Sequence, residues 1–272
     1  MASKHRPRKR FGQHFLHDPG VIERIIRLIQ LDGDQKVVEI GPGLGALTLP
    51  LLRILGALDV VEIDRDLPQQ LRAACVAAGL DPAALHIHQA DALLFDFATL
   101  RTGDQQLRIV GNLPYNISTP LLFHLLEQAE HIQDMHFMLQ KEVVDRLAAP
   151  AGSSDYGRLS VMVQYRCQVN ALFQVGPGAF QPPPKVESAI VRLQPLTQPA
   201  VSVTNEQHFA QVVSQAFSQR RKTLRNSLRT LLSSEAIAAA GVDPAARPET
   251  LPLAGFAALS NCLSNCLSNV TT

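Results

Sequence analysis

The chain has 272 residues, of which 46% are hydrophobic and 18% are charged, and its formal net charge is +1. This composition excludes a disordered polyelectrolyte, and the length suits one large domain with a smaller one. No apolar run reaches the ~20 residues of a membrane-spanning helix, and the basic N-terminus lacks the apolar stretch of a secretory signal. We therefore expect a soluble cytoplasmic protein without a membrane partner.

The elements predicted by hydrophobic periodicity alternate between helix and strand over the first 150 residues. A helix over 19–30 begins at Pro19, with Asp18 as its N-cap, and a strand over 36–40 runs into the glycine loop 41–45. The remaining elements are helices over 46–55, 67–78, 119–129 and 141–148, and strands over 58–63, 85–89, 107–111 and 135–140. Such alternation predicts an α/β fold with a parallel sheet covered on both faces.

The pattern changes after residue 150. We expect strands over 161–175 and 186–193, with the prolines 182–184 forcing an extended segment before the second one. From about Asn205 the apolar spacing is helical. The predicted organisation is a basic arm over 1–17, an α/β domain over 18–199 and a helical domain over 200–272.

Charge is unevenly distributed along the chain. Residues 1–10 and 220–229 each hold five lysines or arginines and no acid, whereas residues 32–104 hold eleven acids against five lysines or arginines. Either basic run alone is equally consistent with a solvated surface, but the two together favour contact with a phosphate backbone.

The four cysteines, Cys75, Cys167, Cys262 and Cys266, are too few and too scattered for a disulfide scaffold. Cys262 and Cys266 could share a helix face, but two ligands do not make a zinc site. We therefore expect no metal, and we expect a monomer.

The glycine loop and three acids predict a nucleoside site. A strand, a glycine-rich loop and a helix form the front half of a nucleotide-binding site, but the spacing G-x-G-x-G and Pro42 weaken the case for cradling a pyrophosphate. Glu39, Glu62 and Asp91 each lie at or just after the end of a predicted strand. A carboxylate at Glu62 suits the two ribose hydroxyls, and Asp91 suits an adenine amine. The excess of acid favours S-adenosylmethionine, which carries a sulfonium, an ammonium and no phosphate.

The sequence Asn112-Leu113-Pro114-Tyr115 follows the strand 107–111 and matches the [DNS]-P-P-[YFW] type of box found in methyltransferases that act on exocyclic amines. The side-chain oxygen of Asn112 or the carbonyl of Leu113 could accept a hydrogen bond from adenine N6. Pro114 stiffens the backbone, and Tyr115 offers a ring on which an extruded base can stack. Alone, the four residues favour a turn; after the glycine loop and the acids they indicate a catalytic box.

Several ordered blocks resemble the small-subunit ribosomal RNA adenine dimethyltransferases, the kasugamycin-sensitivity family. The blocks, which fall between about residues 9 and 230, cover residues 10–16, 38–43, 111–118, 138–143, 156–160 and 180–186. The resemblance implies a Rossmann-like class I methyltransferase sheet with helices on both faces and a small α-helical C-terminal domain. By this resemblance, the basic arm over 1–17 includes a cofactor-contacting segment, the domain over 18–199 is an S-adenosylmethionine-dependent methyltransferase domain, and the helical domain over 200–272 binds RNA. It also implies transfer of four methyl groups from S-adenosylmethionine to two adjacent adenosines near the 3′ end of 16S rRNA in the 30S subunit, with a role in small-subunit biogenesis.

The same resemblance implies roles for individual residues. Phe180 is similar to a phenylalanine that covers the target base opposite Tyr115, and position 14, here histidine, is often asparagine in the family. The cofactor contacts implied are His14, Leu16, Gly41, Gly43, Glu62, Asp91 and Asn112; the residues implied to touch RNA are Arg220, Arg221, Lys222 and Arg225.

Four alternatives stay open on the sequence. A large-subunit rRNA adenine N6-methyltransferase of the macrolide-resistance type would use the same chemistry, although blocks 180–186 and 220–225 favour the small-subunit enzyme. A DNA adenine methyltransferase would need a target-recognition domain that is not evident. A nicotinamide-dependent dehydrogenase would need G-x-G-x-x-G and has no use for the box. A non-catalytic ribosome-assembly factor would bind the same subunit without methylating it.

Overall fold

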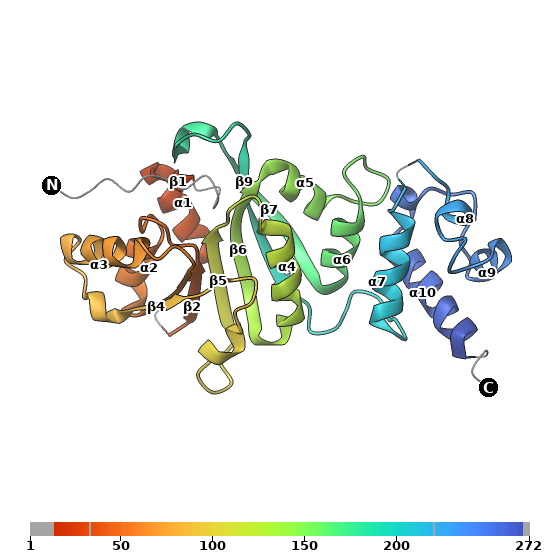
Figure 1. The fold of residues 1–272 in the computed structure, drawn as a ribbon, viewed down its shortest axis with the longest axis horizontal. Helices are drawn as coiled ribbons and strands as arrows, with labels where there is room; N and C mark the ends of the chain where they lie inside the picture. Colours follow the sequence, from red (N-terminus) through yellow and green to blue (C-terminus); the bar gives the residue numbers. More distant parts are fainter. Residues whose placement is uncertain (1–13, 33, 220, 269–272) are drawn as a thin grey trace. The chain divides into compact units, whose positions relative to one another are not determined.

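The computed structural model describes residues 14–32, 34–219 and 221–268, and these residues form two compact units (Figure 1). The first unit holds the residues up to Val144 together with Asn170–Pro195, and the second holds Asp145–Val169 and the residues from Leu196 onward. The chain therefore enters the second unit, returns to the first and leaves it again. Over the described ranges, no helix combines the length and the apolar character needed to cross a bilayer.

A seven-stranded sheet forms the centre of the first unit, in the order β4-β3-β2-β5-β6-β9-β7. Its strands are β2 (Lys36–Ile40), β3 (Leu58–Glu62), β4 (Leu85–Gln89), β5 (Leu107–Asn112), β6 (Ile132–Gln140), β7 (Cys167–Val175) and β9 (Ser188–Pro195). The five strands from β4 to β6 in this order pair in parallel, and β9 runs antiparallel to β6. The predicted α/β class with a parallel-rich sheet is thus confirmed.

The helices between these strands agree with the expected alternation. They are α1 (Pro19–Ile29), α2 (Thr48–Leu55), α3 (Leu67–Ala77), α4 (Ser118–Glu127) and α5 (Lys141–Ala148). The predicted cap of α1 is confirmed, because the Asp18 carboxylate accepts the backbone N–H of Val21 at 3.0 Å. The short 3₁₀ helices are η2 (Pro82–Ala84), η3 (Phe97–Leu100), η4 (Ala129–His131), η5 (Pro177–Ala179) and η6 (Pro248–Thr250).

One face of the sheet packs against α1, α2 and α3. Side chains alternate along a strand, so Arg108, Val110 and Asn112 of β5 share this face, and the parallel register places Glu39 of β2 beside Val110 on it. In the middle of the face, valines and leucines of the strands join the buried residues of the three helices in one apolar cluster. The two ends of β5 therefore carry polar side chains on either side of an apolar centre.

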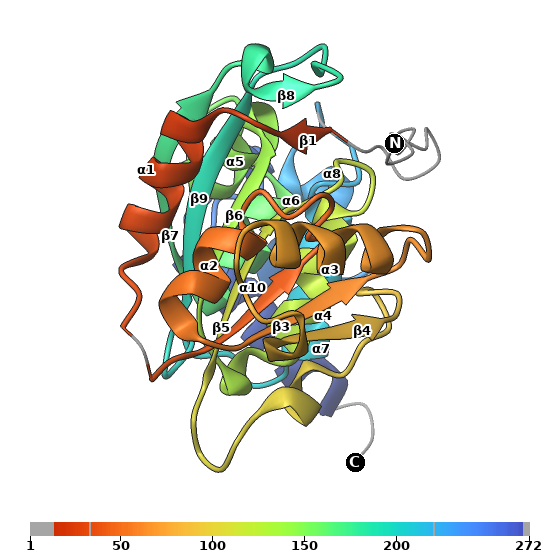
Figure 2. The same ribbon diagram turned by 90° about the vertical axis from the view of Figure 1, so that its left-hand side faces the viewer.

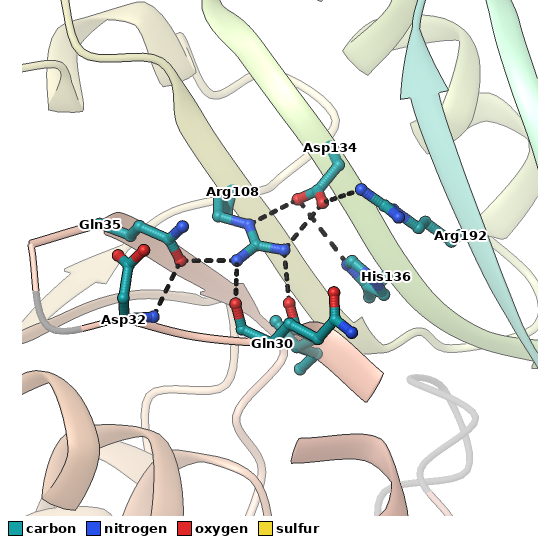
Figure 3. Close-up of polar contacts among 8 residues, drawn as sticks. Gln30, Asp32, Gln35, Arg108, Asp134, His136 and Arg192 are labelled. Carbon is teal, nitrogen blue, oxygen red and sulfur yellow. Dashed lines mark hydrogen bonds and ion pairs between the residues drawn. The ribbon is translucent and has the colours of Figure 1, made fainter. Parts of the chain in front are cut away.

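Arg108 lies at the end of this face where β5 begins, and Figure 3 shows its polar contacts. Its guanidinium binds the Asp134 carboxylate with two hydrogen bonds of 2.8 Å. It also donates to the carbonyls of Ile29 and Gln30 and to the side chain of Gln35. Because the last carbonyls of a helix have no partner inside the helix, Arg108 caps α1 and ties it to the sheet.

Two further residues complete this buried network. Arg192 donates to Asp134 at 3.2 Å, and the ring of His136 lies 3.8 Å from the same carboxylate. His136 is 3% exposed and neither of its ring nitrogens has a hydrogen-bond partner. Burial lowers the pKa of His136 to about 4, and the neighbouring arginines add to this effect against the attraction of Asp134. The imidazole is therefore neutral at physiological pH.

The strand expected over 161–175 is wrong in its first part. Residues Arg158–Arg166 form the helix α6, and only Cys167–Val175 is a strand. Val161, Val163 and Tyr165 recur at every second position, which is typical of a strand, but all three are buried on the helix. Gly157 starts the helix, where its backbone N–H donates to the Ser160 hydroxyl. Packing in the second unit thus overrides the local preference.

Two short strands were not predicted. β1 (Phe15–Leu16) pairs antiparallel with β8 (Phe180–Gln181), so segments about 165 positions apart lie side by side (Figure 2). The peptide bond between Gln181 and Pro182 is cis. Two residues separate the end of β1 from the first residue of α1, so this strand leads directly into the helix whose other end Arg108 caps.

The second unit is mainly helical, with one helix before residue 205 and the others after it. Its helices are α6, α7 (Glu206–Ala216), α8 (Leu224–Ser227), α9 (Ser234–Ala239) and α10 (Leu253–Ser268). They enclose a separate apolar core that includes Phe209, Ile237 and Phe256.

Candidate active site

A cavity opens at the carboxyl ends of the parallel strands in the first unit. Its wall consists of residues 14–16, 39–44, 46–47, 61–63, 90–93 and 112–117. Because the strands are parallel, the loops that leave β2, β3, β4 and β5 meet at one edge, where α/β proteins bind ligands. The cavity brings together the predicted residues His14, Leu16, Gly41, Gly43, Glu62, Asp91, Asn112, Leu113, Pro114 and Tyr115.

The glycine loop lets β1 lie close to the cavity. Gly43 has a φ of +57°, which favours glycine, and a Cβ atom at this position would come within 3.1 Å of the Phe15 ring. A larger residue would have to adopt this unfavourable φ, and the Phe15 ring would have to move to make room for its Cβ atom. The spacing of the glycines thus serves a close approach between two segments, only one of which the sequence motif contains.

The two glutamates of the wall are buried and close enough to repel each other. Glu39 is 2% exposed, and its carboxyl group accepts the Thr48 hydroxyl at 2.6 Å. Burial raises its pKa to about 8, against the effect of this hydrogen bond, and the charge of Glu62 raises it further. Burial also raises the pKa of Glu62, although backbone N–H groups of Asp64 and Gly43 donate to its carboxylate.

The charge of the wall is strongly one-sided. Among the described residues that line it there are three carboxyl groups, those of Glu39, Glu62 and Asp91, one imidazole, that of His14, and no lysine or arginine. With its pKa at about 8, Glu39 is mostly protonated at neutral pH, and the other two acids make the wall repel phosphate and attract a cation. No group of three or more His, Cys, Asp or Glu side chains suited to a metal ion occurs anywhere in the part of the chain that the structure describes.

The orientation of the Asn112 amide follows from its neighbour. Its nitrogen donates to the backbone carbonyl of His14 at 2.9 Å, and a carbonyl can only accept. The amide nitrogen is thus bound to the residue that precedes β1, and the amide oxygen can accept a hydrogen bond from a ligand. The sequence predicted an accepting oxygen at Asn112 but contained no signal for the group that orients it.

Tyr115 is held at its edge and on one face. Its hydroxyl group forms a hydrogen bond of 2.7 Å with the hydroxyl of Ser188 at the start of β9. The His14 ring stacks on it with centroids 5.6 Å apart and planes at 27°. The Nδ1 of His14 lies 2.8 Å from the carbonyl of Pro182 and must donate to it. Ser188 and Pro182 were not among the predicted site residues.

Some predicted residues do not reach the cavity. Phe180 is 2% exposed and lies in the apolar core, paired with Leu16 across β1 and β8. Arg221, Lys222 and Arg225 belong to the second unit, where their side chains are exposed. Arg220 and the basic arm over 1–13 lie outside the described residues.

Comparison with known proteins gives consistent matches over nearly the whole chain. The model of the ribosomal RNA adenine dimethylase family matches residues 4–265. The chain is 59% identical over 258 residues to ribosomal RNA small subunit methyltransferase A of Pseudomonas aeruginosa, covering 95% of each chain. It is 58% identical to the protein of the same name from Nitrosococcus oceani, covering 94% of this chain and 96% of that one.

Two solved structures are similar in fold and detectably similar in sequence. A dimethyladenosine transferase from Plasmodium falciparum has a TM-score of 0.76 and 27% identity, with 90% of this chain and 96% of that chain covered. The 23S rRNA methyltransferase ErmE has a TM-score of 0.69 and 26% identity, with 92% and 99% covered.

Proposed function

Because the chain belongs to the ribosomal RNA adenine dimethylase family, we propose that it transfers methyl groups to the N6 amines of two adjacent adenosines near the 3′ end of 16S rRNA in the 30S subunit. The donor in this proposal is S-adenosylmethionine, and the products are N6,N6-dimethyladenosines. The reaction would place the enzyme in small-subunit biogenesis. The observation that carries the proposal is the fixed amide of Asn112 at the mouth of an acid-walled cavity.

The cavity residues fit the methyl donor in charge. The contacts proposed for it are His14, Leu16, Gly41, Gly43, Glu62, Asp91 and Asn112. Carboxyl groups without a lysine or arginine among the described lining residues suit a ligand that carries a sulfonium and an ammonium, and the absence of a side chain at Gly43 keeps β1 against the loop. When bound, S-adenosylmethionine supplies an electrophilic methyl group.

The protein's own contribution to the chemistry is alignment. The N6 lone pair of adenine is delocalised into the ring, so the amine is a weak nucleophile. If its two N6 hydrogens were donated to the Asn112 amide oxygen and to the carbonyl of Leu113, the nitrogen would turn toward tetrahedral geometry with its lone pair exposed. The ring of Tyr115 would stack against the extruded base. No general base is needed before transfer, because the methylated cation loses its proton readily; the gain is one of orientation.

We also propose roles for Phe180 and for the basic residues near position 220, none of which is among the described residues that line the cavity. Covering of the base by Phe180 requires its ring to turn out of the core, and Phe180→Ala would test this against a role in packing. Arg221, Lys222 and Arg225 are exposed cations suited to phosphate contacts, and Arg220 belongs to the same basic run of the sequence. RNA affinity that depends on such contacts should fall as the salt concentration rises.

The decisive experiment is mass spectrometry of 16S rRNA from 30S particles that lack these methyl groups. After incubation with the protein and S-adenosylmethionine, the 3′-terminal fragment should gain four methyl groups. An unchanged mass would refute the substrate. Naked 23S RNA belongs in the same experiment because of the likeness to ErmE, and methylation of that RNA alone would move the assignment to the large subunit.

A further inference from the structure

We propose that Ser188 is a positioning residue for methyl transfer, acting through the hydrogen bond by which its buried hydroxyl holds the phenol of Tyr115. The inference rests on the proposed function, because Tyr115 is there the ring on which the target adenine stacks. Ser188 itself does not line the cavity and touches no substrate in this proposal. It belongs to no part of the box that the sequence singles out.

The contact is well placed to fix an angle. The two hydroxyl oxygens are 2.7 Å apart, and Ser188 is 0% exposed whereas Tyr115 is only half-buried. The polar edge of the ring is therefore anchored inside the protein while the rest of the side chain lines the cavity. Burial raises the pKa of the Tyr115 hydroxyl, so the group stays protonated and can serve as a hydrogen-bond partner.

The anchor is more rigid than the loop that it holds. Tyr115 lies in the turn between β5 and α4, and its ring can rotate about two side-chain torsions. Ser188 is the first residue of β9, and it pairs in register with Gln140 of β6 inside the seven-stranded sheet. The hydrogen bond thus fixes the plane of the ring relative to the sheet. The same sheet carries Asn112, the proposed partner of the amine.

The neighbours of the ring make this constraint consequential. His14 already covers one face of Tyr115, and its imidazole is tied to the Pro182 carbonyl. A base that stacks on the ring must use the remaining face, so a small tilt of the phenol changes the angle between the N6 lone pair and the methyl donor. Methyl transfer needs the reacting atoms in line, and it is sensitive to displacements well below the size of the base.

The test compares Ser188→Ala, Tyr115→Phe and the double variant. The measured quantities are kcat, KM for 30S particles and the number of molecules that bind S-adenosylmethionine, so that kcat is expressed per competent site. Each single variant should lower this kcat about 2- to 10-fold, the range of one hydrogen bond, with KM and the cofactor Kd unchanged. The double variant should be no worse than either single one, because both remove the same contact.

The control is Ser264→Ala in α10, which removes another buried, hydrogen-bonded hydroxyl from a residue outside the cavity wall. It should leave kcat per competent site unchanged. A Ser188→Ala enzyme with wild-type kcat per site would overturn the inference, as would additive losses in the double variant or a loss confined to thermal stability. If instead the wild-type protein methylates no RNA, the proposed function fails, which is a separate outcome.

Discussion

Two polar clusters lie on the same face of the central sheet, at opposite ends of β5. One surrounds Arg108, and the other contains Asn112 with Glu39 and Glu62. Arg108 and Asn112 are four positions apart, about 13 Å along a strand. Both clusters are largely buried and both contain ionisable groups, yet they differ in how their charge is balanced.

The Arg108 cluster is neutralised from within. Asp134 is 0% exposed and is paired with two arginines, while Arg108 also satisfies the end of α1. The cavity acids have no such partner among the lining residues that the structure describes. The difference teaches that a buried charge balanced by the chain itself serves the fold, whereas an unbalanced one at an open end of the sheet is held for a ligand.

The largest effect is expected where the balanced cluster is broken. Arg108→Met leaves the Asp134 carboxylate buried with only Arg192 and leaves the α1 carbonyls without their donor. The free energy of unfolding should fall by about 3–5 kcal/mol. Calorimetry should show only a small loss for Arg27→Met, whose ion pair with Glu23 joins side chains that are 71% and 72% exposed. Equal losses would mean that the buried network contributes no more than a surface pair.

A comparable change at the other end of β5 should affect catalysis instead of folding. Asn112→Ala removes the acceptor proposed for N6 and should lower the rate of methyl incorporation by about 10²-fold, the scale of one oriented donor or acceptor at a reacting centre. Radiolabelled methyl transfer to 30S particles measures this loss, and thermal denaturation should show a much smaller change than for Arg108→Met. Full activity in the variant would remove Asn112 from the mechanism.

Protonation of His136 should lower the free energy of unfolding, because it adds a positive charge to the Arg108 cluster. Its pKa is about 4 in the folded protein against 6.5 as its ordinary value, so the unfolded chain binds the proton more readily. The related stability is complete above pH 6.5 and declines as pH falls toward 4, by up to about 3 kcal/mol. His136→Met should flatten this part of the profile of unfolding free energy against pH. Parallel profiles would show that the imidazole titrates normally.

The cavity should respond to pH in the opposite direction. The pKa of Glu39 is about 8 in the folded protein against 4.5 ordinarily, so the unfolded chain loses this proton first as pH rises. The related stability is complete below pH 4.5 and declines as pH rises toward 8. Glu39→Gln should therefore be more stable than the wild type at pH 8, with the difference shrinking toward pH 5. Urea denaturation at both pH values measures it. A variant less stable at pH 8 than the wild type would show that the carboxylate is already balanced there.

Local pattern was sufficient for much of the first unit. The strands β2 and β4 and the helix α5 have the predicted bounds, and the cap at Asp18 is as expected. The residues of the glycine loop and of the box also meet in one cavity. These features depend on periodicity and on short segments whose parallel strands end at a common edge, and both can be read from neighbouring residues.

Tertiary structure decided what depends on partners far along the chain. The helix over 158–166 has the alternation of a strand, and only its burial in the second unit makes it helical. The amide of Asn112 is oriented by residue 14, the phenol of Tyr115 by residue 188, and the end of α1 by Arg108. Phe180 lies in the core because β8 pairs with β1. The sequence alone determined which chemical groups are present and the order in which they occur. The hydrogen bonds that aim them join residues 73 to 98 positions apart, and such contacts form only when the sheet register brings their strands together.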